Sequence, residues 1–173
     1  MSTIDISNVE INFLEKTDVV ENLELLNLVI NETHFLARNR EISEEETYDF
    51  FNYWVETRLA IYLTAKYKGK IIGNISNRPR EEELLSHIGY VGYVVHPDYR
   101  RQGVASLLMK KLIEYSIQEG YKILICEVIR ENVASLALLK KFEFEQFGYL
   151  KNAFKINSSE YRDLIMLSKY LDK

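Results

Sequence analysis

The chain has few of the residues that cross-link a protein or anchor it in a membrane. Its 173 residues include one cysteine, Cys126, so no intramolecular disulfide can form, which agrees with a reducing compartment. The segment 1–10 has neither a basic stretch nor an apolar core, so we expect no signal peptide. No apolar run approaches the roughly 18 residues that a membrane span needs. We therefore expect a cytoplasmic protein without membrane contact.

Excess positive charge is also lacking. The chain carries 22 Lys and Arg against 26 Asp and Glu, a net charge of −4. This balance gives no basic footprint for a phosphate backbone, so we do not expect a nucleic-acid partner. Three histidines and one cysteine offer no spacing typical of a metal site. Only two prolines occur and no segment resembles a linker or a repeat, so we expect one domain over residues 1–173.

Hydrophobic periodicity predicts an α/β fold with a mixed sheet. Helices are expected from Asp18 to about residue 30, from a capping box at Ser43 and Glu46 to about 57, over 102–119, and from Asn132 to about 142. Alternating or short apolar runs predict strands at 9–14, 60–66, 70–76, 87–95, 121–129, 144–156 and 160–171. The predicted order is β-α-α-β-β-β-α-β-α-β-β. Gly89 and Gly92 interrupt the strand at 87–95, which indicates a bulge or a close backbone approach.

The most informative segment is V-V-H-P-D-Y-R-R-Q-G-V-A at 94–105. A strand ends at Val95, and Pro97 stops its ladder because proline has no N–H. A helix is expected to begin at about Gln102, where first-turn N–H groups lack intrahelical acceptors and attract an anion.

Four residues in the same segment suit a phosphate group. Gly103 and Ala105 are small enough for it to approach the backbone, and the forks of Arg100 and Arg101 match its oxygens. Each feature alone would fit an ordinary loop with exposed arginines, but their combination is less common. The P-loop and Rossmann fingerprints are absent from the sequence.

The motif Arg100-x-x-Gly103-x-Ala105 resembles R/Q-x-x-G-x-G/A, the coenzyme-A signature of the GNAT superfamily of N-acetyltransferases. Residues 132–144 resemble the second block of that family, N-x-x-A-x-x-L-Y-x-K-x-G-F, and residues 163–166 resemble its last strand. The match extends from about residue 60 onward. It implies a mostly antiparallel central sheet with helices on both faces, splayed between its central strands. It also implies acetyl-CoA as acetyl donor and direct transfer to an amine, in a family where dimers are common.

The resemblance also implies where the cofactor binds. Pantetheine would lie beside the strand that ends at Val95, and the pyrophosphate would bind the amides that follow it. Asn132 would contact the pantetheine or the catalytic water. The implied cofactor residues are Tyr93, Val94, Val95, Arg100, Arg101, Gln102, Gly103, Val104, Ala105, Ser106 and Asn132.

Two positions depart from the family pattern. Leu139 replaces the tyrosine that can protonate the leaving thiolate, so a tyrosine acid at that position is excluded. Glu143 replaces a glycine near the end of the same helix, which puts a tight helix end in doubt.

Acetyl transfer needs a group that takes the proton of the amine. Glu127 is the candidate base, because it is a carboxylate within an apolar strand and follows the L-E-V pattern of some family members as Cys126-Glu127-Val128. The alternative is that Glu127 faces solvent or pairs with Arg130. For the acid we name Tyr149, with Tyr90, Tyr93 and water as alternatives.

The acceptor is expected between the first two helices and the closing strands. A primary amine of a small molecule, such as an amino acid, a polyamine or an amine antibiotic, is the predicted substrate. Two alternatives remain: a peptide or protein N-terminal amine, and an acetyl-CoA sensor without turnover, which Leu139 keeps open.

Overall fold

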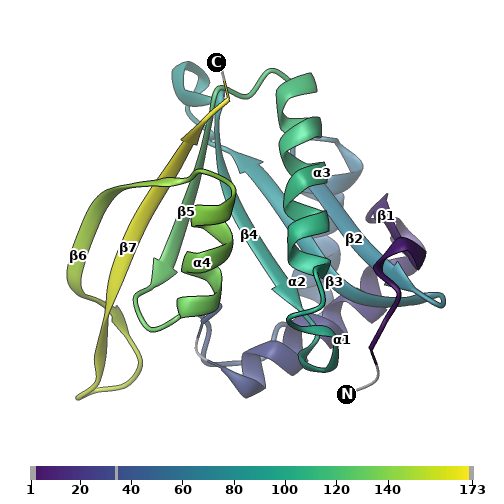
Figure 1. Cartoon of the computed structure of the whole chain (residues 1–173), viewed down its shortest axis with the longest axis horizontal. Helices are drawn as coiled ribbons and strands as arrows, with labels where there is room; N and C mark the ends of the chain where they lie inside the picture. Colours follow the sequence, from purple (N-terminus) through teal and green to yellow (C-terminus); the bar gives the residue numbers. More distant parts are fainter. Residues whose placement is uncertain (1–2, 34, 172–173) are drawn as a thin grey trace.

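The computed structural model describes residues 3–33 and 35–171. Within them, one sheet has the strand order β1-β2-β3-β4-β5-β7-β6 (Figure 1). Its strands are β1 (Val9–Phe13), β2 (Ile61–Tyr67), β3 (Lys70–Pro79), β4 (Ile88–Val95), β5 (Ile123–Ile129), β6 (Glu145–Lys155) and β7 (Tyr161–Tyr170). Only β4 and β5 pair in parallel; the other neighbours are antiparallel. The predicted element order and mixed, mostly antiparallel sheet are confirmed.

The helices cover both faces of this sheet, as expected. In Figure 1, α3 (Val104–Gln118) and α4 (Val133–Lys141) lie in front of the strands, with α1 (Val19–Glu32) and α2 (Glu44–Phe50) behind them. The helix predicted to reach residue 57 changes character on the way, because α2 passes directly into a π-helix, η3 (Phe51–Glu56). A π-helical stretch often marks a functional region.

The main core lies between the sheet and the α3–α4 layer. Leu108 and Leu112 of α3, Leu139 of α4 and Leu124 of β5 are all fully buried there. Truncation of such a leucine to alanine costs about 3–5 kcal/mol. Leu139, which stands where related sequences have tyrosine, is therefore a core residue.

The helix ends show which of the caps predicted from the sequence are present. The capping box at Ser43 and Glu46 is present, and the Asn132 side chain accepts a hydrogen bond from the Ser135 N–H at 3.1 Å. Asp18 does not cap α1; its carboxylate instead accepts a hydrogen bond from Lys66 Nζ at 2.7 Å, because β2 brings that ammonium within reach. Glu143 itself adopts the left-handed conformation (φ 60°) that glycine normally supplies at the end of α4.

The glycines of β4 do not mark a bulge, since the β3–β4 pairing runs unbroken from Gly73↔Val95 to Pro79↔Gly89. Gly89 is instead a point of close approach. A Cβ atom there would lie 1.8 Å from Oδ1 of the buried Asn77, whose Nδ2 donates to Ser116 of α3 at 3.1 Å. Gly92 is exposed, and an added Cβ would meet only Ser76 Oγ at 3.9 Å.

Candidate active site

The centre of the sheet opens between β4 and β5. The parallel ladder has only three pairs and ends at Tyr90↔Ile125, although both strands continue beyond it. Beyond the ladder, the Cys126 thiol donates to Val91 O at 3.5 Å, and Arg100 Nε donates to Val95 O at 3.1 Å. Successive residues of a strand direct their backbone groups to opposite edges. The N–H and C=O of Tyr93 therefore face this gap and can pair with an amide-bearing ligand.

Two of the three predicted strand residues thus reach the gap with their backbone, and the third does not. Tyr93 and Val95 present their edge to it. Val94 directs its backbone to β3, and its side chain is buried against α1 with Leu25 and Val29. Successive residues of a strand direct their backbone groups to opposite edges, so three consecutive residues cannot all face the gap.

At the carboxyl end of β4 the chain turns sharply into α3. Arg101 (φ 60°) and Gly103 (φ 91°) both adopt left-handed conformations, and α3 begins at Val104, two residues later than the sequence predicted. No side-chain hydrogen bond caps this end, and the first helical bond within α3 runs from Leu107 N to Gly103 O at 3.0 Å. The earlier N–H groups, of Val104, Ala105 and Ser106, lie at the positive end of the helix dipole, an arrangement that favours an anion.

The side chains predicted to bind the anion differ in the contacts that they make. Arg100 forms a bidentate pair with Glu32 at the end of α1, at 2.8 and 2.6 Å, so its fork braces the loop in this structure. Gln102 also braces it, accepting from Ile4 N at 2.8 Å and donating to Asp98 O at 3.1 Å. Arg101 is exposed.

One cation near the helix start was not singled out from the sequence. Lys141 of α4 donates from Nζ to Ser106 Oγ in the first turn of α3, at 3.1 Å. Its position as the lysine of the second motif block was the available signal. Lys141 thus adds positive charge beside the start of α3.

Tyr93 also brings an unpartnered hydroxyl to the cofactor side of the sheet. Its side chain packs against the core under α3 and α4, and its Oη is buried and makes no hydrogen bond within the described residues, although Ser135 lies near it. Burial raises the pKa of Tyr93, and the neighbouring Cys126 adds to this effect. A buried hydroxyl without a partner is costly, so Tyr93 can donate a hydrogen bond to a ligand in the gap, with the Ser135 hydroxyl as the alternative acceptor.

The two predicted catalytic residues lie on opposite faces of the sheet. Glu127 pairs with Met166 and Tyr149 with Ile165, and adjacent residues of β7 point to opposite faces. Glu127 is exposed on the α1–η3 face, so of the two alternatives the structure has the one in which this side chain faces solvent; within the described residues its carboxylate has no ion-pair partner, and Arg130 pairs with Asp163 instead. Tyr149 donates to Asp163, and this hydrogen bond raises the pKa of Tyr149, which makes it a weaker acid.

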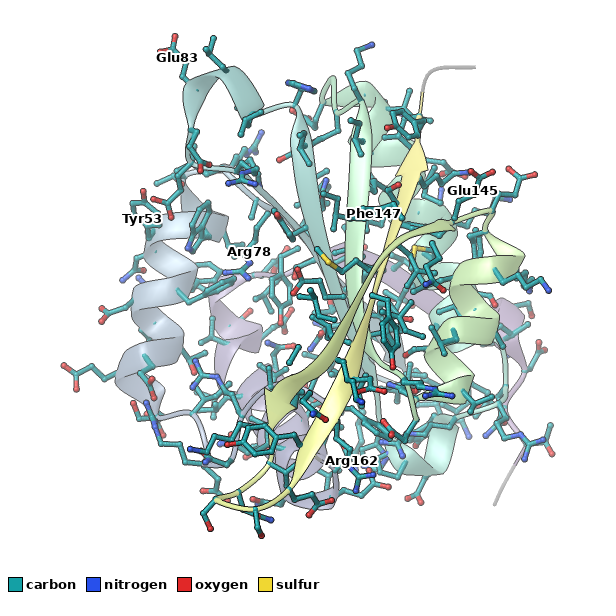
Figure 2. All side chains as sticks on the ribbon, turned by 90° about the vertical axis from the view of Figure 1, so that its left-hand side faces the viewer. Tyr53, Arg78, Glu83, Glu145, Phe147 and Arg162 are labelled. Carbon is teal, nitrogen blue, oxygen red and sulfur yellow. The ribbon has the colours of Figure 1, made fainter. Side chains whose placement is uncertain are left out.

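A cleft opens on the Glu127 face, beside the end of the β4–β5 ladder. Its volume is about 580 Å³, and its lining includes Trp54 of η3, Arg78 and Arg80 from the end of β3, and Tyr90 of β4. In Figure 2, Arg78 is seen between η3, which carries Tyr53, and the β6–β7 pair, which carries Phe147. The cleft shares only Trp54 with the region where the acceptor was expected, because its other lining residues come from β3, β4 and the segment between them.

Two further searches of residues 3–33 and 35–171 concern other classes of site. No group of three or more His, Cys, Asp or Glu side chains there could hold a metal ion. None of the helices in that part of the chain is long and apolar enough to cross a membrane.

These features define an acyl-CoA-dependent transferase: a sheet split between two parallel strands, with an uncapped helix start at one end of the split. Residues 26–144 match the family model described as Acetyltransferase (GNAT) family. The chain belongs to this family and is an acetyl-CoA-dependent acetyltransferase.

Individual relatives agree with the family match. N-alpha-acetyltransferase 30 of Dictyostelium discoideum is 31% identical over 130 residues, which are 73% of this chain and 68% of that protein. A GNAT acetyltransferase structure from Streptococcus pneumoniae is 26% identical with a TM-score of 0.85, covering 94% of this chain and 99% of that one. A phosphinothricin acetyltransferase from Sinorhizobium meliloti, solved in complex with acetyl-CoA, has a TM-score of 0.85 at 16% identity, covering 94% and 88%.

Proposed function

We propose that this acetyltransferase passes the acetyl group directly to a primary amine of a small molecule that enters from the α1–η3 face. The observation that carries the proposal is the exposed Gly92, which borders the open gap in mid-sheet on the same face as Glu127. The cofactor features lie at the gap and on its α3–α4 side. Donor and acceptor can therefore meet through the gap from opposite faces.

Direct transfer is supported by the state of the one cysteine. Cys126 is buried, its thiol donates to Val91 O, and burial raises its pKa. A thiol of this kind is a poor nucleophile. We therefore expect no acetyl-cysteine intermediate in the reaction.

In the proposed reaction the amine nitrogen bonds to the thioester carbonyl carbon, and the carbon–sulfur bond breaks. Glu127 takes the proton released from the nitrogen, directly or through a water molecule. Because Glu127 is exposed, water can reach it and carry this proton.

The departing sulfur gains its proton from Tyr93 or from water. Leu139 is buried in the core and offers no hydroxyl, whereas Tyr93 of β4 packs against the same core and has a buried hydroxyl without a hydrogen-bond partner within the described residues. Burial raises the pKa of Tyr93, so this tyrosine is, like Tyr149, a weaker acid than a free tyrosine, but it stays protonated at neutral pH and can donate a hydrogen bond to the sulfur. We assign Tyr93, rather than Tyr149, to this role because Tyr93 lies on the strand that borders the gap, whereas Tyr149 lies on β6 and donates to Asp163. The main chain of Tyr93, the first-turn amides of α3, Arg101, Lys141 and Asn132 are the residues we propose to hold the cofactor.

A peptide N-terminal amine is the second candidate acceptor. It is favoured by the name of the Dictyostelium relative, an N-alpha-acetyltransferase, at 31% identity. The exposed, open face around Gly92 is compatible with a chain end as well as with a free amine.

The test is titration of acetyl-CoA followed by thiol release with amino acids, polyamines, amine antibiotics and short peptides. Release that depends on a free small amine supports the proposal. Release with peptides alone supports the second candidate. Tight binding of acetyl-CoA without release from any amine would contradict turnover and favour a sensor.

A further inference from the structure

The two arginines that line the proposed acceptor cleft, Arg78 and Arg80, differ in their ion pairing. Arg80 forms a bidentate pair with Glu82, with Nε–Oε2 and Nη2–Oε1 distances of 3.0 and 2.7 Å. This pair lowers the pKa of Glu82 to about 2, so both groups are charged and balance each other at neutral pH. Arg80 therefore already has an anionic partner within the wall of the cleft.

Arg78 lines the same cleft and has no such partner. Its guanidinium carbon lies 5.9 Å from the centre of the Phe50 ring, and no carboxylate of the described residues lies within 4.0 Å of it. An arginine stays charged at every physiological pH. Glu81 and Glu82 also line the cleft, so its two arginines are matched by two carboxylates, but neither carboxylate forms an ion pair with Arg78. The planar fork of Arg78 is therefore available to pair with a ligand.

Tyr90 places a second donor beside it. Arg78 and Tyr90 are cross-strand partners, so their side chains leave the same face of the sheet with Cβ atoms roughly 5 Å apart. Arg80 Nη1 donates to the Tyr90 oxygen at 3.4 Å. The Tyr90 oxygen is the acceptor in that bond, and its own proton can be donated into the cleft.

We propose that the acceptor is an amine that also carries a carboxylate, as a free amino acid does, and that Arg78 binds this carboxylate with help from the Tyr90 hydroxyl. A guanidinium fork and a neighbouring hydroxyl donor together match the two oxygens of a carboxylate. This inference rests on the proposed function and specifies its substrate class.

The distance to the reacting centre favours a compact molecule. Gly92 lies two residues beyond Tyr90 on the same face, which is about 6.6 Å along a strand. An acceptor whose carboxylate contacts Arg78 can therefore present its amine at the gap if only a few bonds separate the two groups. Trp54 of η3 offers an apolar wall for the remaining side chain.

The test compares amino acids with their carboxamides, which keep the amine and lose the negative charge. Arg78→Met keeps most of the side-chain length and removes the charged fork. Arg58→Met is the matched control, because Arg58 is an exposed arginine outside this cleft. KM and kcat are measured by thiol release, and binding of the same amino acid and carboxamide is measured by calorimetry with coenzyme A present.

For the wild type we expect the best amino acid to have a KM and a Kd 10- to 100-fold below those of its carboxamide. Arg78→Met should raise both constants for the amino acid by that factor, leave kcat within about threefold, and leave the carboxamide unchanged. Arg58→Met should change neither series.

Two results would overturn the inference: equal use of acid and carboxamide by the wild type, or an Arg78→Met loss of the same size in both series. A preference for peptides, whose carboxylate is remote from the amine, would also overturn it. Failure of the proposed function itself looks different, because then no amine of either series releases thiol.

Discussion

Substitution of Gly103 separates the charge of the anion site from its shape. Gly103 has φ 91° and precedes α3, and an added Cβ would meet only Ile6 atoms at 3.7 and 3.8 Å. Any L-residue there costs about 1–2 kcal/mol for the left-handed backbone, which lowers Tm by a few degrees in a domain of this size. Gly103→Glu and Gly103→Gln share that cost and differ by one negative charge.

The charge difference is expected to dominate cofactor affinity. A carboxylate about 5 Å from one phosphate charge is repelled by about 3 kcal/mol at an effective dielectric constant of 20, or on the order of 200-fold in Kd. Calorimetric titration of acetyl-CoA at low salt should therefore show Gly103→Glu binding at least 10-fold more weakly than Gly103→Gln after screening. The difference in affinity between the two variants should become smaller in 1 M salt. Equal affinities of the two variants at low salt would refute a diphosphate site at the start of α3.

Four variants test the remaining assignments. Glu127→Gln should lower kcat about 100-fold near neutral pH and recover partly as rising pH deprotonates the amine; an unaltered rate from pH 6 to 9 would exclude Glu127 as the base. Tyr93→Phe should lower kcat about 10-fold or more with little change in Tm, and a wild-type rate would leave water as the acid. Glu143→Gly should raise the free energy of unfolding by about 1 kcal/mol in denaturant titrations, because it relieves a left-handed glutamate; no gain would contradict that conformation. Glu32→Gln should release Arg100 and weaken acetyl-CoA binding a few-fold by calorimetry, whereas tighter binding would show that Arg100 itself reaches the phosphates.

The sequence predicted the order of elements because each long element carries a local signal. Helix α3 has its apolar stripe, the second helix has its capping box, and β5 is a continuous apolar run. The uncapped helix start that we propose for the diphosphate was predictable for the same reason, since its glycine, its loop and its helix are consecutive in the chain.

Contacts between distant segments could not be predicted in this way. Asp18 lost its expected capping role to Lys66, 48 residues away, and the fork of Arg100 is taken by Glu32, 68 residues away. The glycine positions in β4 were recognised, but only the structure shows that Gly89 makes room for Asn77.

Glu127 shows why an apolar neighbourhood in sequence does not imply burial. One face of β5 lies under α3 and α4, where Leu124, Cys126 and Val128 are buried, and the other face carries Ile125, which is half-buried, and Ile129, which is buried. Glu127 belongs to the other face, which is open where β4 has diverged.

The replacement of the family tyrosine by Leu139 can be related to the opening of the sheet between β4 and β5. With Leu139 fully buried, α4 stabilises the core at the position where the family pattern has a tyrosine, and Tyr93 of β4 brings to the same core a buried hydroxyl that has no partner within the described residues. A donor on a strand is held more rigidly than one on a short helix, and here it lies on the same strand whose edge faces the cofactor gap. If Tyr93 has taken over the role, Leu139→Tyr should not rescue Tyr93→Phe, because a phenol at 139 would have to displace core side chains rather than enter the slot. Rescue by that double variant would show instead that α4 can still present a hydroxyl to the leaving sulfur.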